Sequence, residues 1–174
     1  MKEIEIERTF LAKYLPEDLE NFESMEIYDK YFPANAHHPN LRLRRKEGKF
    51  EITKKQHVQE GDASVQSEHT IELTKEEFEN LDSAPGKTLR KKRYFYKSKD
   101  GIECEIDVFC DKLEGLALVE IEFKNNEDKE NAILPDFILA DVTNDDWVAG
   151  GMLAGKSCKD IEKFLVEKGY KKMI

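Results

Sequence analysis

The sequence is poor in cysteine, and its 174 residues contain no long hydrophobic run. The three cysteines, Cys104, Cys110 and Cys158, are an odd number without C-x-x-C spacing, which favours neither a disulfide framework nor a zinc site. No apolar stretch approaches the roughly 20 residues that cross a bilayer. Charged and apolar residues alternate in the first ten positions, so this segment does not form the apolar core of a signal peptide. We therefore expect a cytoplasmic protein without a membrane partner.

Basic residues are scarce relative to acidic ones: 28 Lys and Arg stand against 37 Asp and Glu, giving a net charge of −9. The resulting field repels phosphate backbones, so nucleic acid is not an expected partner, although a local basic pocket is compatible with this balance. Apolar residues make up 39% of the chain and include ten Phe and six Tyr, which suffice for a core. The length predicts a single domain over residues 1–174.

Apolar and polar side chains alternate along most of the chain, which is the pattern of strands with two different faces. The predicted strands cover residues 2–10, 26–32, 40–47, 50–56, 66–73, 89–97, 102–109, 116–124 and 137–143. Short turns join several consecutive strands, which favours an antiparallel sheet. Helices are predicted near residues 15–18, from Thr74 and after Ser157, and the polar segment 56–67 is predicted to be a long loop.

The charged side chains of these strands are sorted by sign. One face of the strands at 2–10, 102–109 and 116–124 carries acidic pairs, whereas one face of the strands at 40–47 and 89–97 carries Arg and Lys. Solvated faces usually mix the two signs within a strand, although an open sheet with one wet face is the alternative. Eight or nine strands can close with the charged face inward. We predict an α+β fold: a closed antiparallel eight-stranded β-tunnel with a charged interior and helices packed outside.

A tunnel with these side chains suits a metal ion together with a polyphosphate. Mg²⁺ and Mn²⁺ bind carboxylate oxygens, while Arg and Lys bind phosphate oxygens, Arg often through two parallel hydrogen bonds. Glu5 and Glu7 are two residues apart on one strand, about 6–7 Å between their Cα atoms, so both side chains reach the same lumen. A triphosphate-containing small molecule is therefore the expected partner.

The charged positions belong to a series of short motifs. They are Glu5-Ile6-Glu7-Arg8-Thr9, Asp29-Lys30-Tyr31-Phe32, Leu41-Arg42-Leu43-Arg44, Ile52-Thr53-Lys54-Lys55, Lys91-Lys92-Arg93-Tyr94, Glu105-Ile106-Asp107-Val108-Phe109 and Val119-Glu120-Ile121-Glu122. Their order and spacing resemble the CYTH domain, the family of triphosphate tunnel metalloenzymes. The resemblance implies a closed β-tunnel and the hydrolysis of a triphosphate, most simply inorganic tripolyphosphate, with Mg²⁺ or Mn²⁺.

The resemblance also implies roles for individual residues. It implies metal binding by Glu5, Glu7, Asp107, Glu120 and Glu122, and phosphate binding by Arg42, Arg44, Lys55, Lys91 and Arg93. The candidate catalytic residues are Glu5, Glu7, Lys55, Arg93 and Tyr31. A homodimer is expected by analogy with the family alone.

Three alternatives stay open. Other members of the family act on thiamine or nucleoside triphosphates, or cyclise ATP as class IV-type adenylate cyclases. Thr9 stands where the family motif has Lys, so a module that binds triphosphate or polyphosphate without turnover is a further interpretation. Residues 150–157 match the P-loop pattern G-x-x-x-x-G-K-[ST], but that pattern needs a parallel strand directly before it and a βαβ unit around it.

Overall fold

The computed structural model describes residues 2–173, and their nine strands form one sheet. The strands are β1 (Lys2–Ala12), β2 (Ser24–Phe32), β3 (Leu41–Lys46), β4 (Lys49–Gln59), β5 (Asp62–Leu73), β6 (Lys87–Lys97), β7 (Glu103–Phe109), β8 (Ala117–Glu122) and β9 (Ile138–Asp141). Their order is β5-β4-β3-β2-β6-β7-β8-β1-β9, and every pairing is antiparallel. The nine predicted strands are therefore confirmed.

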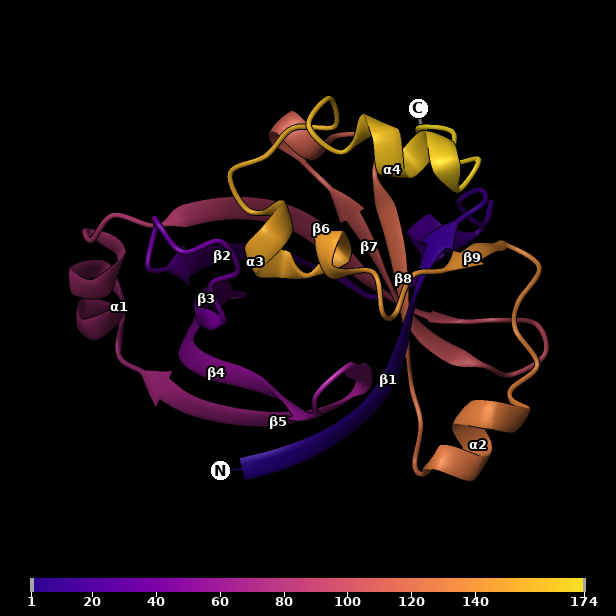
Figure 1. Ribbon diagram of the computed structural model, residues 1–174, viewed down its shortest axis with the longest axis horizontal. Helices are drawn as coiled ribbons and strands as arrows, with labels where there is room; N and C mark the ends of the chain where they lie inside the picture. The colour runs from indigo at the N-terminus through magenta and orange to yellow at the C-terminus, as the bar shows by residue number, and fades with distance from the viewer. Residues whose placement is uncertain (1, 174) are drawn as a thin grey trace.

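The long first strand closes the sheet into a barrel. The first half of β1 pairs with β5, from Lys2 to Ile6, and the second half pairs with β8, from Glu7 to Leu11. The resulting ring consists of β1 to β8. Figure 1 shows this ring with β9 alongside the end of β1. The predicted closed β-tunnel is confirmed, because the strands at both ends of the hydrogen-bonded series meet through β1.

Local sequence explains several of the connections. The β3–β4 hairpin turns at Glu47 and Gly48, which both have positive φ (46° and 75°), as a two-residue hairpin turn with matching twist requires. Helix α1 (Lys75–Asp82) begins with a capping box: the Thr74 side chain accepts from the backbone N–H of Glu77, and the Glu77 carboxylate accepts from that of Thr74. The helix predicted from Thr74 is thus confirmed.

Two predictions about local structure are wrong. The segment 56–67 is not a long loop, because β4 runs to Gln59, β5 starts at Asp62 and only a tight turn with Gly61 at φ 83° separates them. Residues 56–60 are exposed and residues 62–67 are mostly polar, so no apolar face marks these parts of the strands. The helix predicted near residues 15–18 is only the 3₁₀ turn η1 (Leu19–Asn21), in which Leu19 is buried against the barrel.

Apolar side chains form two cores. The outer core covers the outside of β1, β6, β7 and β8, and consists of Phe10, Ala12, Leu19, Tyr94, Tyr96, Cys104, Ile106, Ala117, Val119, Ile121 and Phe137. The end core lies at one end of the barrel and consists of Leu11, Tyr31, Leu89, Phe109, Leu113, Leu116, Leu118, Val142, Trp147, Leu153, Ala154, Ile161, Leu165 and Tyr170. It joins inward side chains of the strands to the segment that follows β9.

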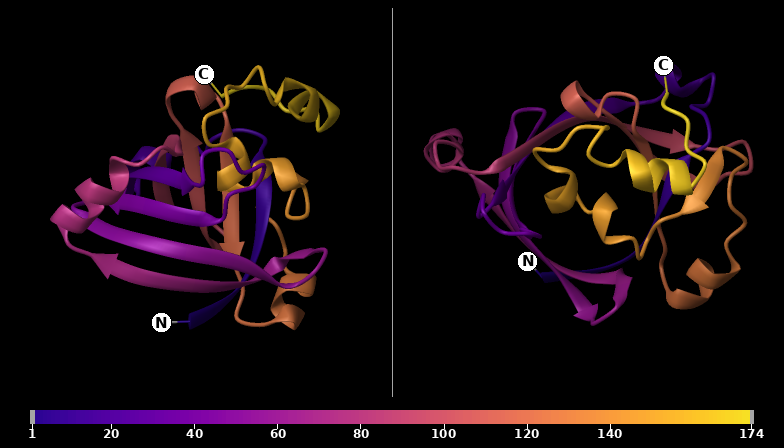
Figure 2. Two further views of the ribbon diagram at one scale, coloured as in Figure 1. Left: turned by 60° about the vertical axis from the view of Figure 1, so that its left-hand side comes forward. Right: turned by 45° about the horizontal axis from the view of Figure 1, so that its top comes forward.

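The segment after β9 covers the end of the tunnel that the end core fills. It contains the 3₁₀ turn η3 (Asp146–Val148), α3 (Gly150–Leu153) and α4 (Glu162–Glu167), which lie over the barrel opening in the right-hand view of Figure 2. Trp147 of η3 stacks on Phe164 of α4, with ring centroids 5.6 Å apart. Helices α1 and α2 (Asn126–Asn131) lie outside the barrel. Within residues 2–173, no helix has the length and apolar composition to cross a membrane.

Candidate functional site

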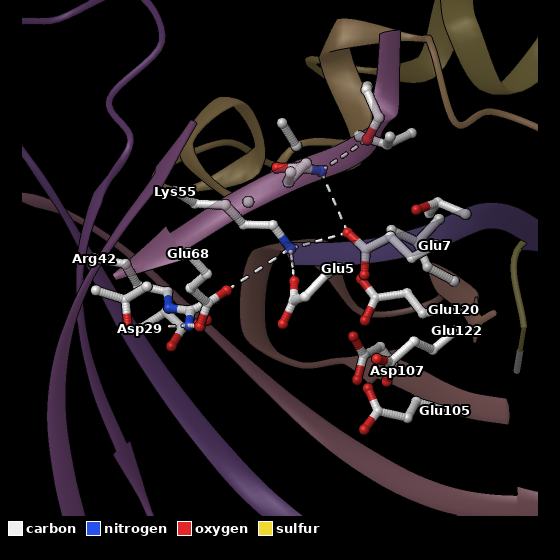
Figure 3. Close-up of a pocket in the computed structure, with 18 of the residues that line it drawn as sticks. Glu5, Glu7, Asp29, Arg42, Lys55, Glu68, Glu105, Asp107, Glu120 and Glu122 are labelled. Atoms are coloured by element: carbon white, nitrogen blue, oxygen red, sulfur yellow. Dashed lines mark hydrogen bonds and ion pairs between the residues drawn. The ribbon is translucent and has the colours of Figure 1, made fainter. Parts of the chain in front are cut away.

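The barrel encloses a cavity of about 1370 Å³ that is lined by side chains from all eight strands of the ring. Inward side chains include Glu5 of β1, Arg42 of β3, Glu68 of β5 and Glu120 of β8 (Figure 3). The prediction that the charged faces turn toward one another is therefore confirmed. All the predicted site residues line this one cavity: Glu5, Glu7, Tyr31, Arg42, Arg44, Lys55, Lys91, Arg93, Asp107, Glu120 and Glu122.

The two signs occupy different parts of the wall. Strands β1, β7 and β8 supply most of the carboxylates, while β3 and β6 supply most of the cations. Among the described side chains that line the cavity, carboxylates outnumber Lys and Arg by twelve to eight. The protein alone thus presents an acid-rich interior with a basic side.

Lys55 links the two sides. Its Nζ donates to Oε2 of Glu5 at 2.8 Å and to Oε1 of Glu7 at 2.9 Å, and lies 3.9 Å from Glu68 (Figure 3). Burial alone would lower the pKa of Lys55, but the charges of Glu7 and Glu5 outweigh burial and raise it. Burial raises the pKa of Glu7, with Lys55 opposing the shift and Glu120 adding to it. Lys55 therefore carries its charge and partly neutralises the carboxylates of β1.

Arg44 and Asp29 form a buried pair across β2 and β3. Nε of Arg44 donates to Oδ1 of Asp29 and Nη2 donates to Oδ2, each at 2.7 Å. Asp29 is 1% exposed, and although burial would raise its pKa, the charge and hydrogen bonds of Arg44 lower it. Both groups are therefore charged, and the guanidinium group meets the carboxylate through its Nε–Nη2 edge, which is a side-on pair.

Arg42 is held far less tightly than Arg44. Its Nη2 lies 3.6 Å from Glu68 and 4.0 Å from Glu51, and makes one long hydrogen bond of 3.4 Å to Thr53. Its buried Nε has no hydrogen-bond partner within the described part of the chain. Because a buried N–H without a partner is costly, Arg42 is the cation of this wall that is best prepared to bind an added anion.

A second buried cluster surrounds Asp107. Arg93 donates from Nε and Nη2 to the two oxygens of Asp107, each at 2.7 Å, and Lys91 also donates to Asp107. Arg93 further contacts Glu105 and Glu120. Burial would raise the pKa of Asp107, but Arg93 and then Lys91 lower it. The predicted phosphate-binding cations Arg93 and Lys91 are therefore engaged with carboxylates of the protein itself.

Several carboxylates face one another across neighbouring strands. Glu7 is paired with Glu122 between β1 and β8, and Glu105 is paired with Glu120 between β7 and β8. Directly opposed like charges destabilise a sheet unless something compensates them. Burial raises the pKa of Glu105, with Arg93 opposing the shift, and Glu120 adds to the rise.

The chemistry of this carboxylate wall fits a hard divalent cation, which prefers oxygen donors and retains water. Glu5, Glu7, Glu120 and Glu122 would hold it. Within residues 2–173, no three His, Cys, Asp or Glu side chains already converge on one metal-sized position. The predicted metal assignments, including that of Asp107, stay predictions.

Tyr31 and Thr9 lie toward the covered end of the cavity. The Tyr31 ring belongs to the end core, and burial raises the pKa of its hydroxyl to about 12, so it stays protonated at neutral pH. Thr9 lies opposite Glu120 on β8 and lines the cavity, and its backbone N–H donates to the Thr143 hydroxyl at 3.1 Å. The position at which the family motif carries a cation is therefore neutral here.

The segment 150–157 does not have the structure of a P-loop. Its helix, α3, occupies the first half of the motif, and the strand before it, β9, is antiparallel to β1. Both the backbone N–H and the hydroxyl of Ser157 donate to Asp160, at 2.7 Å. Gly150 and Gly151 instead line the end of the cavity, where a Cβ on Gly150 would lie 2.0 Å from the Tyr31 hydroxyl oxygen.

Sequence reasoning missed several residues of the cavity. They are Asp29, Glu51, Glu105 and the segment from Val148 to Gly151. Glu51 and Glu105 share the charged parity of their strands, so the alternation already contained that signal. Asp29 stands in the motif Asp29-Lys30-Tyr31-Phe32, but the strand alternation gave it no role, because it is a single acid on the inward face of its strand.

Comparison with known proteins agrees with this geometry. The model of the CYTH domain family matches residues 3–138. The inorganic triphosphatase of Nitrosomonas europaea is 32% identical over 142 residues, which cover 81% of this chain and 90% of that protein. Among solved structures, the hypothetical protein NE1496 has a TM-score of 0.65 at 30% identity, covering 88% of this chain and 99% of that one. The inorganic triphosphatase NE1496 has a TM-score of 0.64 at 28% identity, covering 87% and 95%.

Proposed function

This chain belongs to the CYTH domain family, and from that membership we propose that it hydrolyses inorganic tripolyphosphate with the help of Mg²⁺ or Mn²⁺. The similarity to an inorganic triphosphatase supports a triphosphate hydrolase.

One observation carries the proposal: the barrel cavity presents arginines on one side and carboxylates on the other, with twelve carboxylates to eight Lys and Arg. Only a ligand that combines a polyanion with cations satisfies both sides. A bare triphosphate would be repelled by the acidic excess, since like charges interact strongly in a partly desolvated interior. Divalent cations would remove that repulsion, which is the physical reason to expect metal dependence.

The side chains have distinct tasks in this scheme. Arg42, Arg44 and Arg93 bind the phosphate oxygens, and the charge of Arg93 also stabilises the negative charge that develops on the transferring phosphoryl group. Glu5, Glu7, Glu120 and Glu122 hold the cation. When bound, the cation polarises the phosphoryl group and lowers the pKa of a coordinated water. Lys55 lies between the carboxylates and the side of the cavity that binds phosphate, so its ammonium group can contact either of them.

A binding module without turnover is the second candidate, and Thr9 is the observation that favours it. Thr9 is neutral and faces Glu120, so position 9 itself supplies no cation to assist the attack of water. In this alternative, the same residues bind the triphosphate and the reaction does not follow.

The test is a panel of phosphate-release assays on the purified chain. Tripolyphosphate, ATP and thiamine triphosphate are each assayed with Mg²⁺, with Mn²⁺ and with a chelator, and cyclic AMP is measured for ATP. We expect phosphate release from tripolyphosphate in the presence of metal only. Binding of tripolyphosphate without turnover of any substrate would instead support the binding module.

A variant pair connects activity to the cavity. Glu5→Ala removes a carboxylate of the cavity, and we expect at least about a hundredfold loss of metal-dependent turnover, the scale of one lost transition-state contact. Glu26→Ala is the matched control, because Glu26 is exposed on the outer face of β2. Equal loss in both variants, or no loss in Glu5→Ala, would contradict the assignment.

A further inference from the structure

Asp29 is almost fully buried beneath the cavity, and the reaction described above gives it no task. Strand pairing places Asp29 on β2 directly opposite Arg44 on β3. The two hydrogen bonds between them, each 2.7 Å, use both oxygens of the carboxylate and the Nε edge of the guanidinium group. The fold itself therefore sets this contact, and no long flexible side chain has to find its partner.

A side-on pair fixes the plane of the guanidinium group. It uses Nε and Nη2 of Arg44 and leaves Nη1, with two further N–H donors, on the side away from Asp29. Within residues 2–173, no hydrogen bond uses Nη1 of Arg44, although Arg44 lines the cavity. A donor group that is already oriented loses less freedom when an anion binds.

Asp29 also influences the other cations of this wall. Arg42 and Lys91 both help to lower its pKa, after the larger contributions of burial, which acts in the opposite direction, and of Arg44. The charge of Asp29 therefore offsets part of the repulsion among Arg44, Arg42 and Lys91 before any phosphate is present.

We propose that Asp29 is a positioning residue of the phosphate site, which holds the Arg44 guanidinium in one orientation so that its Nη1 edge meets a phosphate oxygen. The inference rests on the proposed function and extends it to a residue that touches no substrate. It assigns Asp29 to the affinity of the site and not to the chemical step.

The test compares Asp29→Asn with Asp111→Asn. Asp111 forms the same kind of side-on pair with Arg90, at 2.9 and 3.2 Å, but on the exposed surface away from the cavity. We expect Asp29→Asn to raise KM for tripolyphosphate by about tenfold to a hundredfold, since displacing a binding group by about 1 Å has effects of that size. The value of kcat should change far less, and Asp111→Asn should match the wild type in both constants.

Calorimetric titration with tripolyphosphate in the presence of Mg²⁺ or Mn²⁺, with phosphate release followed in parallel, separates this inference from the proposed function. If the wild type binds tripolyphosphate without hydrolysing it, the proposed function fails, and a tenfold or greater weakening of Kd in Asp29→Asn still supports the positioning role. If Asp29→Asn is merely less heat-stable, with KM and Kd unchanged, Asp29 is only structural and the inference is overturned. A wild type that does not bind tripolyphosphate would overturn both proposals.

If Asp29→Asn alone does not fold, the same question can be tested in a variant that already lacks Arg44. Arg44→Gln removes the group through which Asp29 acts, and Arg44→Gln combined with Asp29→Asn leaves a neutral pair of similar size. If Asp29 acts through Arg44, adding Asp29→Asn to Arg44→Gln should leave KM and Kd unchanged. A further large loss in the double variant would overturn the inference.

Discussion

The guanidinium group of Arg93 binds Asp107 side-on, with Nε to Oδ1 and Nη2 to Oδ2 both at 2.7 Å. Asp107 is 0% exposed and faces Arg93 directly across β6 and β7. Asp107→Asn removes the negative charge that Arg93 and Lys91 share, so the buried Lys91 loses its salt bridge, although Arg93 keeps its contacts with Glu105 and Glu120. We expect the free energy of unfolding to fall by about 3–5 kcal/mol, the usual effect of breaking a buried ion pair from one side. Urea denaturation without added metal measures this change.

The metal-free condition separates two roles of Asp107. If Asp107 acted only as a metal ligand, Asp107→Asn would leave the metal-free protein as stable as the wild type. Asp111→Asn serves again as the control, because it breaks an exposed Asp–Arg pair of the same geometry. Exposed pairs contribute little to stability, so the control should unfold at nearly the wild-type urea concentration.

The pKa shifts predict that acid inactivates the protein before acid unfolds it. Burial raises the pKa of Glu7 above its usual 4.5, and a protonated Glu7 cannot hold a cation. Burial would also raise the pKa of Asp29, but Arg44 lowers it below 3.8. The stability that the Asp29–Arg44 pair contributes is therefore fully present above pH 3.8, the pKa of an ordinary Asp. It is lost only as the pH falls through the lower pKa that Asp29 has in the folded protein.

Two pH profiles check this prediction. Phosphate release from tripolyphosphate should begin to fall at a pH above 4.5, where far-UV circular dichroism still reports the intact barrel. The reason is that protons titrate Glu7 while the aspartates paired with arginine remain ionised. Activity and circular dichroism that fall together would contradict the separation.

The alternation of side chains predicted the inward face of the barrel because it is a local property of each strand. Charged inward positions such as Glu5, Arg44 and Glu122 have the parity read from their own strands, whatever their neighbours are. The partners of the individual charges could not be predicted in this way. Lys55 meets Glu5 because β5 closes onto β1, and Asp29 meets Arg44 because β2 lies beside β3. Strand order, rather than residue spacing, decides which cation neutralises which carboxylate.

The covered end of the tunnel shows a second limit of the sequence. Gly150 matched the first glycine of a nucleotide-binding pattern and Gly151 follows it, yet the structural reason for both is steric: a Cβ on Gly151 would lie 2.0 Å from the backbone oxygen of Pro39. Glycines in a pattern indicate that another group packs closely against the backbone, but they do not identify that group as a ligand or as another part of the chain. Here the neighbours are Tyr31 and Pro39, which are more than a hundred residues away in the chain.

The same contact gives a prediction for Gly151→Ala. The added methyl group would collide with backbone, which cannot move aside as a flexible side chain can, so the segment that covers the tunnel must shift. We expect a loss of about 1–3 kcal/mol in the free energy of unfolding, as for other overpacked sites. Thermal unfolding of the variant measures the loss. A variant as stable as the wild type would contradict this close packing.

Lys156→Ala is the companion variant, because Lys156 is the lysine of the P-loop pattern. It does not line the cavity, so we expect its removal to leave KM and kcat for tripolyphosphate within about twofold of the wild type, as for surface positions away from a site. Phosphate-release kinetics measure both constants. A large loss of activity would instead support nucleotide binding by the segment 150–157.

Thr9→Lys tests the departure of this chain from its family motif. Thr9 faces the cavity opposite Glu120, in a wall where carboxylates are in excess, so a lysine here would have an anionic partner. We expect faster hydrolysis of tripolyphosphate, by about tenfold or more, because a cation near the phosphoryl group stabilises the charge of the transition state. Thr9→Met is the matched control, since it adds similar length without charge. If Thr9→Lys is no faster than Thr9→Met, a cation at this position does not limit the reaction, and Lys55 or Arg42 already provides the charge. If the wild type binds without turnover and Thr9→Lys gains activity, the neutral residue at position 9 is what separates a binding module from an enzyme.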